Sequence, residues 1–387
     1  MIYRIINISK NRSLFLFGAR GTGKSTLVKS IIHQSEESTL WIDLLKETDE
    51  ERYGRHPDLL SHDLLGTKYD RVVIDEVQKA PKLLDIVHLE IEKNKNLQFI
   101  LTGSSARKLK RGGANLLAGR AFTYSLFPFT FIELGDDFNL LDALKYGSLP
   151  GIYELDGLEK IEFLRSYVRT YLKEEIQIEQ LIRKLNPFKD FLEIAAQLNG
   201  EILNYAKFSR DVGVDDKTIV NYFQILEDTL LGFYLPAFHR SVRKRQLESP
   251  KFYFFDLGVK RALERSLTID LKPHSFAYGS AFEQFIIIES YRLNEYFRKD
   301  YRLSYLKTKD GAEIDLVILR PGLPDALIEI KSFERIKIDS IKHLKAFQKS
   351  WDQPCECFVF SQDVNDSIVE EVHFIHWKKG LKLLFSI

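Results

Sequence analysis

Apolar runs and amphipathic segments alternate along the first third of the chain. Mostly apolar runs lie at residues 13–17, 71–74 and 97–101 (SLFLF, RVVI and LQFIL), a pattern typical of strands buried inside a sheet. The segment after the first run, LVKSIIHQ, has apolar residues at helical spacing. This alternation predicts an α/β domain with a parallel sheet over residues 1–133.

The middle of the chain is dominated by helical spacing. Residues 134–187 predict a helical connector or lid, for which the sequence offers no chemistry. Residues 204–228 predict two helices separated by a tight turn at Gly213, and two strand-like runs follow, GFYLPAF and KFYFFDLG. Residues 188–258 are therefore expected to form a winged helix.

The last part of the chain, residues 259–387, has the predicted order helix, three strands, helix, strand. The first helix reads GSAFEQFIIIESYRLNEYF and carries Glu283 on its first turn. The strands read YRLSYLK, EIDLVIL, ALIEIKS and, after the second helix, ECFVFS. This order predicts a second α/β domain.

Composition changes this picture little. The 387 residues allow two or three domains, and 44% hydrophobic with 29% charged residues is ordinary for a globular protein. No run reaches the roughly 18 apolar residues that a membrane span needs, and the N-terminus lacks a signal-peptide layout, so we expect a cytoplasmic protein without membrane contact. The net charge of +1 neither supports nor excludes binding of nucleic acid.

The two cysteines, Cys355 and Cys357, do not suggest a zinc site. They lack a second cysteine pair or a His at zinc spacing, and we interpret them as strand residues.

The loop after the first apolar run contains the first candidate chemistry. Its sequence GARGTGKST has the phosphate-binding pattern G-x4-G-K-[ST] between a predicted strand and a predicted helix. Its glycines let the backbone N–H groups face the phosphates, and the helix N-terminus attracts the same anion. We expect Lys24 to reach the β- and γ-phosphates of ATP and the Ser25 hydroxyl to ligate Mg²⁺. The predicted ATP-binding residues of the loop are Gly18, Gly21, Gly23, Lys24, Ser25 and Thr26.

Polar residues end the other two apolar runs. Asp75 is expected to hold Mg²⁺ through water, and Glu76 to act as the general base on the attacking water. Thr102 and Ser104 are both candidates for sensing the γ-phosphate. Arg120 is a candidate arginine finger for a neighbouring subunit's ATP, although an ordinary salt bridge would explain it equally.

The motifs GARGTGKST, VVIDEVQK, LTGSSARKL and LAGR resemble an AAA-type ATPase family that is common in bacteria and archaea, whose members carry a C-terminal domain of unknown function. The motifs YGSLPG, YLKEE, KFYFFDLG and GSAFEQFI extend the resemblance over essentially the whole chain. The resemblance implies ATP binding and a restriction-endonuclease-like C-terminal fold. Because AAA-type sites usually borrow residues from a neighbour, we also expect a homo-oligomer.

Strand alternation places charged residues together in the C-terminal domain. Residues two apart share a face, so Glu329 and Lys331 point one way while Ile328 and Ile330 point into the core. An adjacent strand brings Asp315 beside them.

These groups suggest a metal site. Asp315 and Glu329 are expected to hold Mg²⁺ or Mn²⁺, and Lys331 to orient or help deprotonate the attacking water. Glu283 would supply a further carboxylate. The arrangement resembles the PD-(D/E)xK nuclease fold, with these four residues on its signature positions. A surface salt-bridge cluster on an ordinary sheet is the alternative.

Contact with DNA is expected at the tip of the predicted wing. The cations there are Arg240, Arg243, Lys244 and Arg245. The alternative is a packing or oligomerisation module with a solvated tip.

The leading hypothesis is an ATP-driven DNA-processing enzyme whose C-terminal domain cleaves phosphodiesters. A regulatory NTPase switch that only binds DNA or a protein partner is the second hypothesis. A third is a signalling ATPase with a helix-turn-helix module.

Overall fold

The chain folds into two compact units, which are described separately. The computed structural model describes residues 2–34, 36–104, 117, 119–171, 185–239, 248–308, 311–333 and 342–387. The first unit comprises Met1–Phe129, Leu149–Gly151 and Ile225–Leu231, and the second comprises Thr130–Ser148, Ile152–Gln224 and Gly232–Ile387. Within the described residues, no helix is both long enough and apolar enough to cross a membrane.

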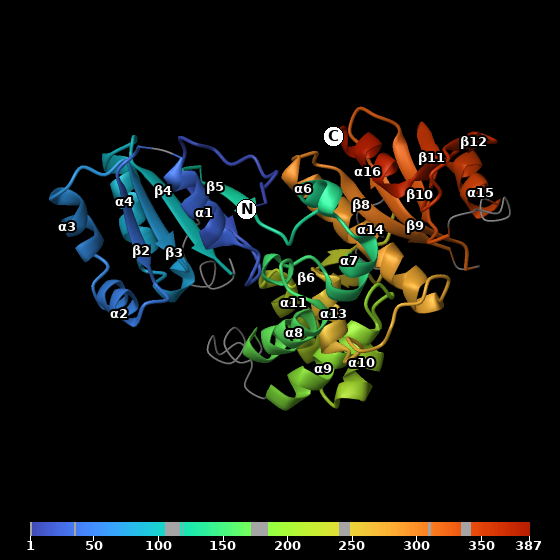
Figure 1. Ribbon diagram of the computed structural model, residues 1–387, viewed down its shortest axis with the longest axis horizontal. Helices are drawn as coiled ribbons and strands as arrows, with labels where there is room; N and C mark the ends of the chain where they lie inside the picture. The colour runs from blue at the N-terminus through green and yellow to red at the C-terminus, as the bar shows by residue number, and fades with distance from the viewer. Residues whose placement is uncertain are drawn as a thin grey trace. The chain divides into compact units, whose positions relative to one another are not determined.

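A five-stranded sheet forms the centre of the first unit (Figure 1). The strands are β1 (Leu14–Phe17), β2 (Thr39–Asp43), β3 (Arg71–Asp75), β4 (Gln98–Gly103) and β5 (Phe122–Ser125). Their order is β2-β3-β4-β1-β5, and every neighbouring pair is parallel, which confirms the predicted parallel sheet. The described helices are α1 (Lys24–His33), α2 (Glu47–Arg55), α3 (Leu59–Leu65), the short η1 (Val77–Lys79) and α4 (Leu83–Lys93).

This strand order explains where the polar motifs meet. β1, β4 and β3 lie side by side, and all three are almost completely buried, as expected of the inner strands of a parallel sheet. The residues that follow their carboxyl ends therefore gather at one edge of the sheet.

The second unit begins with helices. They are α6 (Phe131–Leu134), η2 (Gly135–Asp137), α7 (Leu140–Tyr146), α8 (Gly157–Tyr171), α9 (Leu185–Gln197), α10 (Tyr205–Val212) and α13 (Leu257–Leu263). Two further helices, η3 (Pro150–Ile152) and α11 (Asp216–Asp228), belong partly to the first unit. A hairpin of β6 (Gly232–Leu235) and β7 (Lys251–Phe254) follows α11. Gly213, at φ 75°, ends α10 as the predicted turn. The helix–turn–helix and hairpin elements are thus observed where the sequence predicts them.

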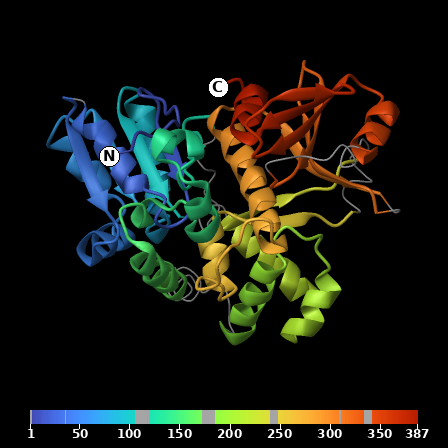
Figure 2. The same ribbon diagram turned by 45° about the vertical axis from the view of Figure 1, so that its right-hand side comes forward.

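The C-terminal part is a six-stranded mixed sheet with three helices (Figure 2). The strands are β8 (Arg302–Lys307), β9 (Glu313–Leu319), β10 (Asp325–Ile330), β11 (Cys355–Ser361), β12 (Ser367–Val369) and β13 (Val372–His376), in the order β12-β13-β11-β10-β9-β8. The helices are α14 (Phe276–Tyr296), α15 (Lys342–Ser350) and α16 (Trp377–Phe385). β8, β9 and β10 are antiparallel neighbours, whereas β10, β11 and β13 run parallel.

Two predictions for this part need correction. Helix α14 begins at Phe276, because the Ser275 side chain caps it by accepting from the N–H of Tyr278 at 3.2 Å. Gly279 therefore lies inside the helix, and Glu283 is not on the first turn. The elements β12, β13 and α16 extend the predicted order beyond β11.

Two motifs without assigned chemistry meet in a buried joint of the second unit. Asp256, from KFYFFDLG, accepts the N–H of Ser148, from YGSLPG, at 2.7 Å. Gly147 has φ 74°, and a Cβ atom there would lie 2.0 Å from an Asp256 carboxylate oxygen. A Cβ at Gly258 would lie 1.9 Å from the carbonyl oxygen of Tyr146. These glycines are thus required by close packing between the two motifs.

A buried ion pair on α14 completes the joint. Arg292 is 2.9 Å from Glu289, and it donates to the Ser148 hydroxyl at 3.1 Å and to the Phe255 carbonyl at 2.7 Å. Glu289 also accepts the N–H of Phe131 at 2.9 Å. Both charged groups of the pair therefore have further hydrogen-bond partners, which offset the cost of burying them.

Candidate functional sites

The loop between β1 and α1 has the backbone that phosphate binding requires. Gly21 and Gly23 have φ of 76° and 90°, in the left-handed region that favours glycine. Gly18 is needed for a different reason: a Cβ there would lie 2.4 Å from the carbonyl oxygen of Leu126. The Lys24 side chain is 6% exposed, and its ammonium donates to the Gly18 carbonyl at 2.8 Å, so it lies over the loop itself.

A hydroxyl and a carboxylate converge beside this loop. The Ser25 hydroxyl donates to Asp75 Oδ2 at 2.7 Å, and Thr102 donates to the other oxygen of the same carboxylate. Hard oxygen ligands of this kind fit Mg²⁺. Asp75 is buried at the carboxyl end of β3, where the sequence predicts it.

Glu76 stands next to these groups in an unusual conformation. Its φ of 60° and ψ of 48° place it in the left-handed region, which is uncommon for a residue other than glycine and clusters at functional sites. Its backbone N–H donates to the Thr102 hydroxyl at 3.1 Å. Its side chain is 3.8 Å from the Lys24 ammonium.

Gln78 is a site residue that sequence reasoning missed. Its amide nitrogen donates to the Glu76 carboxylate and, at 3.0 Å, to the Ser104 hydroxyl. No motif spacing marks it, because it follows the acidic pair on the η1 turn. Thr102 thus contacts Asp75 directly, and Gln78 links Ser104 to Glu76.

The remaining predicted residues of this site lie further out. Thr26 is exposed on α1. Arg120 forms an ion pair with Glu92 of α4, and this pair lowers the pKa of the glutamate. Arg120 therefore has a partner within its own unit.

In the second unit the predicted carboxylates and lysine do lie together. The register of β9 and β10 pairs Leu316 with Ile328, and continuing it by one residue places Asp315 directly opposite Glu329. Asp315 Oδ2 accepts the N–H of Ile330 at 2.7 Å, and the ammonium of Lys331 forms an ion pair with Glu329.

Burial and mutual repulsion act strongly on these acids. Burial and the nearby Asp315 raise the pKa of Glu283 to about 8, and the same two causes raise the pKa of Glu329 to about 7. Burial likewise raises the pKa of Asp315. The negative charge of these carboxylates is therefore not fully compensated by nearby cations, and a divalent cation would compensate it.

Few protein side chains are available to ligate such a cation. In the part of the chain that the structure describes, no three His, Cys, Asp or Glu side chains are placed to hold one metal ion. A metal at Asp315 and Glu329 would therefore take its other ligands from water, from substrate or from Glu283 once that carboxylate leaves Lys251.

A lysine that the sequence analysis did not single out also reaches this cluster. Lys251 is the first residue of β7, and its ammonium lies 2.7 Å from Glu313 and 3.8 Å from Glu283. Only the fold brings it there, because β7 lies outside the helix-and-strand order that carries the predicted site.

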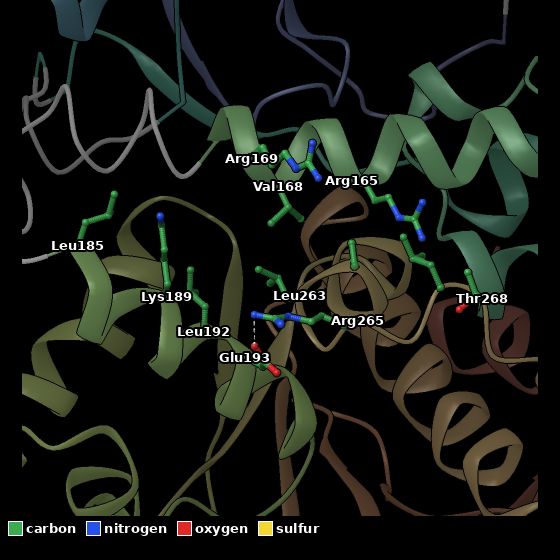
Figure 3. A pocket seen from close by; sticks show the side chains of 12 residues that line it. Arg165, Val168, Arg169, Leu185, Lys189, Leu192, Glu193, Leu263, Arg265 and Thr268 are labelled. Atoms are coloured by element: carbon green, nitrogen blue, oxygen red, sulfur yellow. Dashed lines mark ion pairs between the residues drawn. The ribbon is translucent and has the colours of Figure 1, made fainter.

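A separate cavity of about 720 Å³ opens in the second unit between α8, α9 and α13 (Figure 3). Its lining combines apolar side chains with cations such as Arg169 and Lys189, and Arg265 forms an ion pair with Glu193 at 2.8 Å. None of the residues with predicted chemistry lines it. The predicted DNA-binding residues Arg240, Arg243, Lys244 and Arg245 lie outside the described residues.

Comparison with known families agrees with the first site. Residues 10–135 match the family described as AAA domain. Residues 138–272 and 278–379 match two domains of unknown function, DUF8612 and DUF4143. The N-terminal part of the chain, with its phosphate-binding loop and parallel sheet, is an AAA-type P-loop ATPase domain.

Relatives share most of the chain. A protein of Mycobacterium tuberculosis described as uncharacterized is 24% identical over 315 residues, which cover 80% of this chain and 68% of that protein. An uncharacterized protein of Methanocaldococcus jannaschii is 24% identical over 392 residues, covering 86% of this chain and 80% of the relative.

Among solved structures, the chain is similar to the RuvB Holliday junction branch migration motor of Thermotoga maritima. The TM-score is 0.33 at 15% identity, over 57% of this chain and 81% of that one. A TM-score this low does not establish a shared fold or function.

Proposed function

We propose that this protein hydrolyses ATP at the edge of the parallel sheet in its first unit. The carrying observation is the convergence of Lys24, the Ser25–Asp75 pair and Glu76 at the ends of neighbouring strands. This set contains a cation for phosphate oxygens, two oxygen ligands for Mg²⁺ and a carboxylate for the attacking water.

Each residue of this site would have a separate role in ATP binding and hydrolysis. Gly21 and Gly23 turn backbone N–H groups toward the phosphates, and Lys24 offsets their charge. Ser25 and Asp75 would hold Mg²⁺, which supplies charge compensation for the phosphates when it is bound. Glu76 takes the water proton, and Gln78 holds that carboxylate in place.

Assembly into an oligomer would give Arg120 a role in this ATPase. An arginine finger acts on a neighbour's nucleotide, and Arg120 would exchange its ion pair with Glu92 for a phosphate. Assembly into a homo-oligomer is part of the proposal.

Variants of the first site test ATP hydrolysis by measuring phosphate release. We expect Glu76→Gln to lower kcat by about a hundredfold or more with ATP affinity kept, because it removes the base alone. Lys24→Ala should lose ATP binding. Glu51→Gln, on the exposed surface of α2, is the control and should behave as wild type. Hydrolysis that is unchanged in Glu76→Gln would remove this residue from the mechanism.

A second activity, metal-dependent phosphodiester cleavage of DNA, is proposed for the C-terminal site. Its carrying observation is the cluster of Asp315, Glu329 and Lys331 at the end of adjacent antiparallel strands, beside the half-buried Glu283. Mg²⁺ or Mn²⁺ would bind the first two carboxylates, and Lys331 would orient the attacking water.

Incubation of wild type with single- and double-stranded DNA or RNA and Mg²⁺ or Mn²⁺, with and without ATP, tests this activity. We expect cleavage that Lys331→Ala and Asp315→Asn abolish and that Lys349→Ala, an exposed change on α15, leaves intact. Absence of cleavage under every condition, with ATP hydrolysis intact, would instead favour a regulatory ATPase whose C-terminal domain only binds its partner.

A further inference from the structure

Strand β7 presents a buried cation to the carboxylate site. The Lys251 side chain is 6% exposed, and its ammonium lies 2.7 Å from Glu313 Oε1 and 3.8 Å from Glu283 Oε1. The ring of Tyr305 lies beneath it, with 5.2 Å between the ammonium and the ring centroid. An ammonium so deeply buried is stable only while these carboxylates face it.

Tyr253, two residues further along β7, lies in the field of the same acids. Its side chain is fully buried, and its hydroxyl has no hydrogen-bond partner among the described residues. Burial, followed by the charges of Glu283 and Asp315, raises the pKa of this phenol. Buried polar groups are rarely left unpaired, so an orphaned hydroxyl beside the acids points to a group that binds there.

A second lysine shows what is particular to Lys251. Lys307 of β8 also pairs with Glu313, at 2.8 Å, but its side chain is 42% exposed. The described contacts of Lys307 do not include Glu283. Both lysines thus pair with Glu313, but only Lys251 has a described contact with Glu283 as well.

We propose that Lys251 is an internal counter-cation that a divalent metal ion must displace from Glu283. This inference rests on the metal site proposed above, because it concerns how that site is controlled. A metal ion and the Lys251 ammonium are both positively charged and repel each other when they share the Glu283 carboxylate. Binding of the metal therefore favours separation of Lys251 from Glu283. Glu313 remains as the partner of Lys251, so the ammonium is not left uncompensated.

The geometry therefore couples metal binding to the β6–β7 hairpin. Lys251 moves with β7, and any change that draws this strand away from α14 frees Glu283 for a cation. A change that seats the strand firmly has the opposite effect on metal affinity.

Calorimetric titration with Mn²⁺, in the full chain without nucleotide, tests the proposal. We expect Lys251→Met to bind Mn²⁺ about tenfold more tightly than wild type, because one competing charge is gone. Lys251→Gln should do the same, and Lys251→Arg, which keeps the charge, should not. Lys307→Met is the matched control and should leave the affinity unchanged.

The outcomes separate this inference from the metal site itself. Tighter binding that disappears in the Lys251→Met, Glu283→Gln double variant supports the competition. Binding by wild type that is lost in Asp315→Asn but is unchanged or weaker in both charge-removing variants, with thermal unfolding showing them folded, overturns the inference alone. If neither wild type nor Lys251→Met binds Mn²⁺, the metal site and the inference fall together.

Discussion

Single backbone conformations decide much of the first site. Glu76 occupies the left-handed region without being glycine, and the contacts of Thr102 and Gln78 hold it there. The motif spacing predicted which residues gather here, because strand ends in a parallel sheet share an edge. Spacing did not predict that Gln78 would orient Glu76, since that contact depends on the η1 turn.

Gly23→Ala is expected to destabilise the first unit by about 1–2 kcal/mol through its left-handed backbone. ATP affinity should fall as well, because the loop N–H groups no longer face the phosphates. Chemical denaturation and a nucleotide-binding titration measure the two effects.

Gly54→Ala provides the comparison for that variant. Gly54 lies in α2, and the methyl carbon of an alanine there would have no neighbouring atom within 4 Å. The change should therefore be neutral or stabilising by roughly 0.5–1 kcal/mol, because alanine favours the helix. Equal losses in the two variants would contradict the conformational argument.

Elements were predicted well where apolar runs are long, and the elements after residue 361 were not predicted. The inner strands β1, β3 and β9 follow their apolar runs closely. Helix α16 contains Gly380, where a Cβ would lie 2.3 Å from the ring of Phe360. Gly380 is thus a close-packing residue, and one sequence does not distinguish that from a turn.

Gly147→Ala should destabilise the second unit more than its φ alone explains. The added methyl group would collide with the Asp256 carboxylate. We therefore expect the free energy of unfolding to fall by more than about 3 kcal/mol in total, whereas a left-handed backbone alone costs roughly 1–2 kcal/mol. Denaturant unfolding followed by tryptophan fluorescence measures it.

Gly322→Ala isolates the packing contribution. Gly322 has a similar φ of 80° but no atom within 4 Å of the added methyl group, so only the backbone cost remains. If the two variants lose the same stability, the joint around Asp256 is not tightly packed.

Taken over the entire chain, the protein carries an unusual set of buried acids. Burial raises the pKa of Glu283 to about 8 and of Glu289 and Glu329 to about 7, above the range of these groups in an unfolded chain. The folded state therefore holds more protons than the unfolded state, and the stability that these groups contribute is highest at low pH and falls as pH rises through these values.

We expect the second unit to lose stability as pH rises from about 4.5, the value of these groups in an unfolded chain, to about 8, and to level off above that, as followed by urea unfolding at about five pH values. Glu283→Gln should flatten this dependence, because it removes the acid with the highest of the three pKa values. A stability that stays flat or rises over the same window would show that these carboxyls take up no protons on folding.

The joint between YGSLPG and KFYFFDLG has a consequence for how the sequence can change over time. Replacing Gly147 requires a smaller partner at position 256, yet a smaller partner leaves the N–H groups of Ser148 and Val259 without their acceptor. Each single substitution is therefore expected to destabilise the joint, and the two positions to change together when they change at all. Two motifs that lie far apart along the chain are then constrained as a pair.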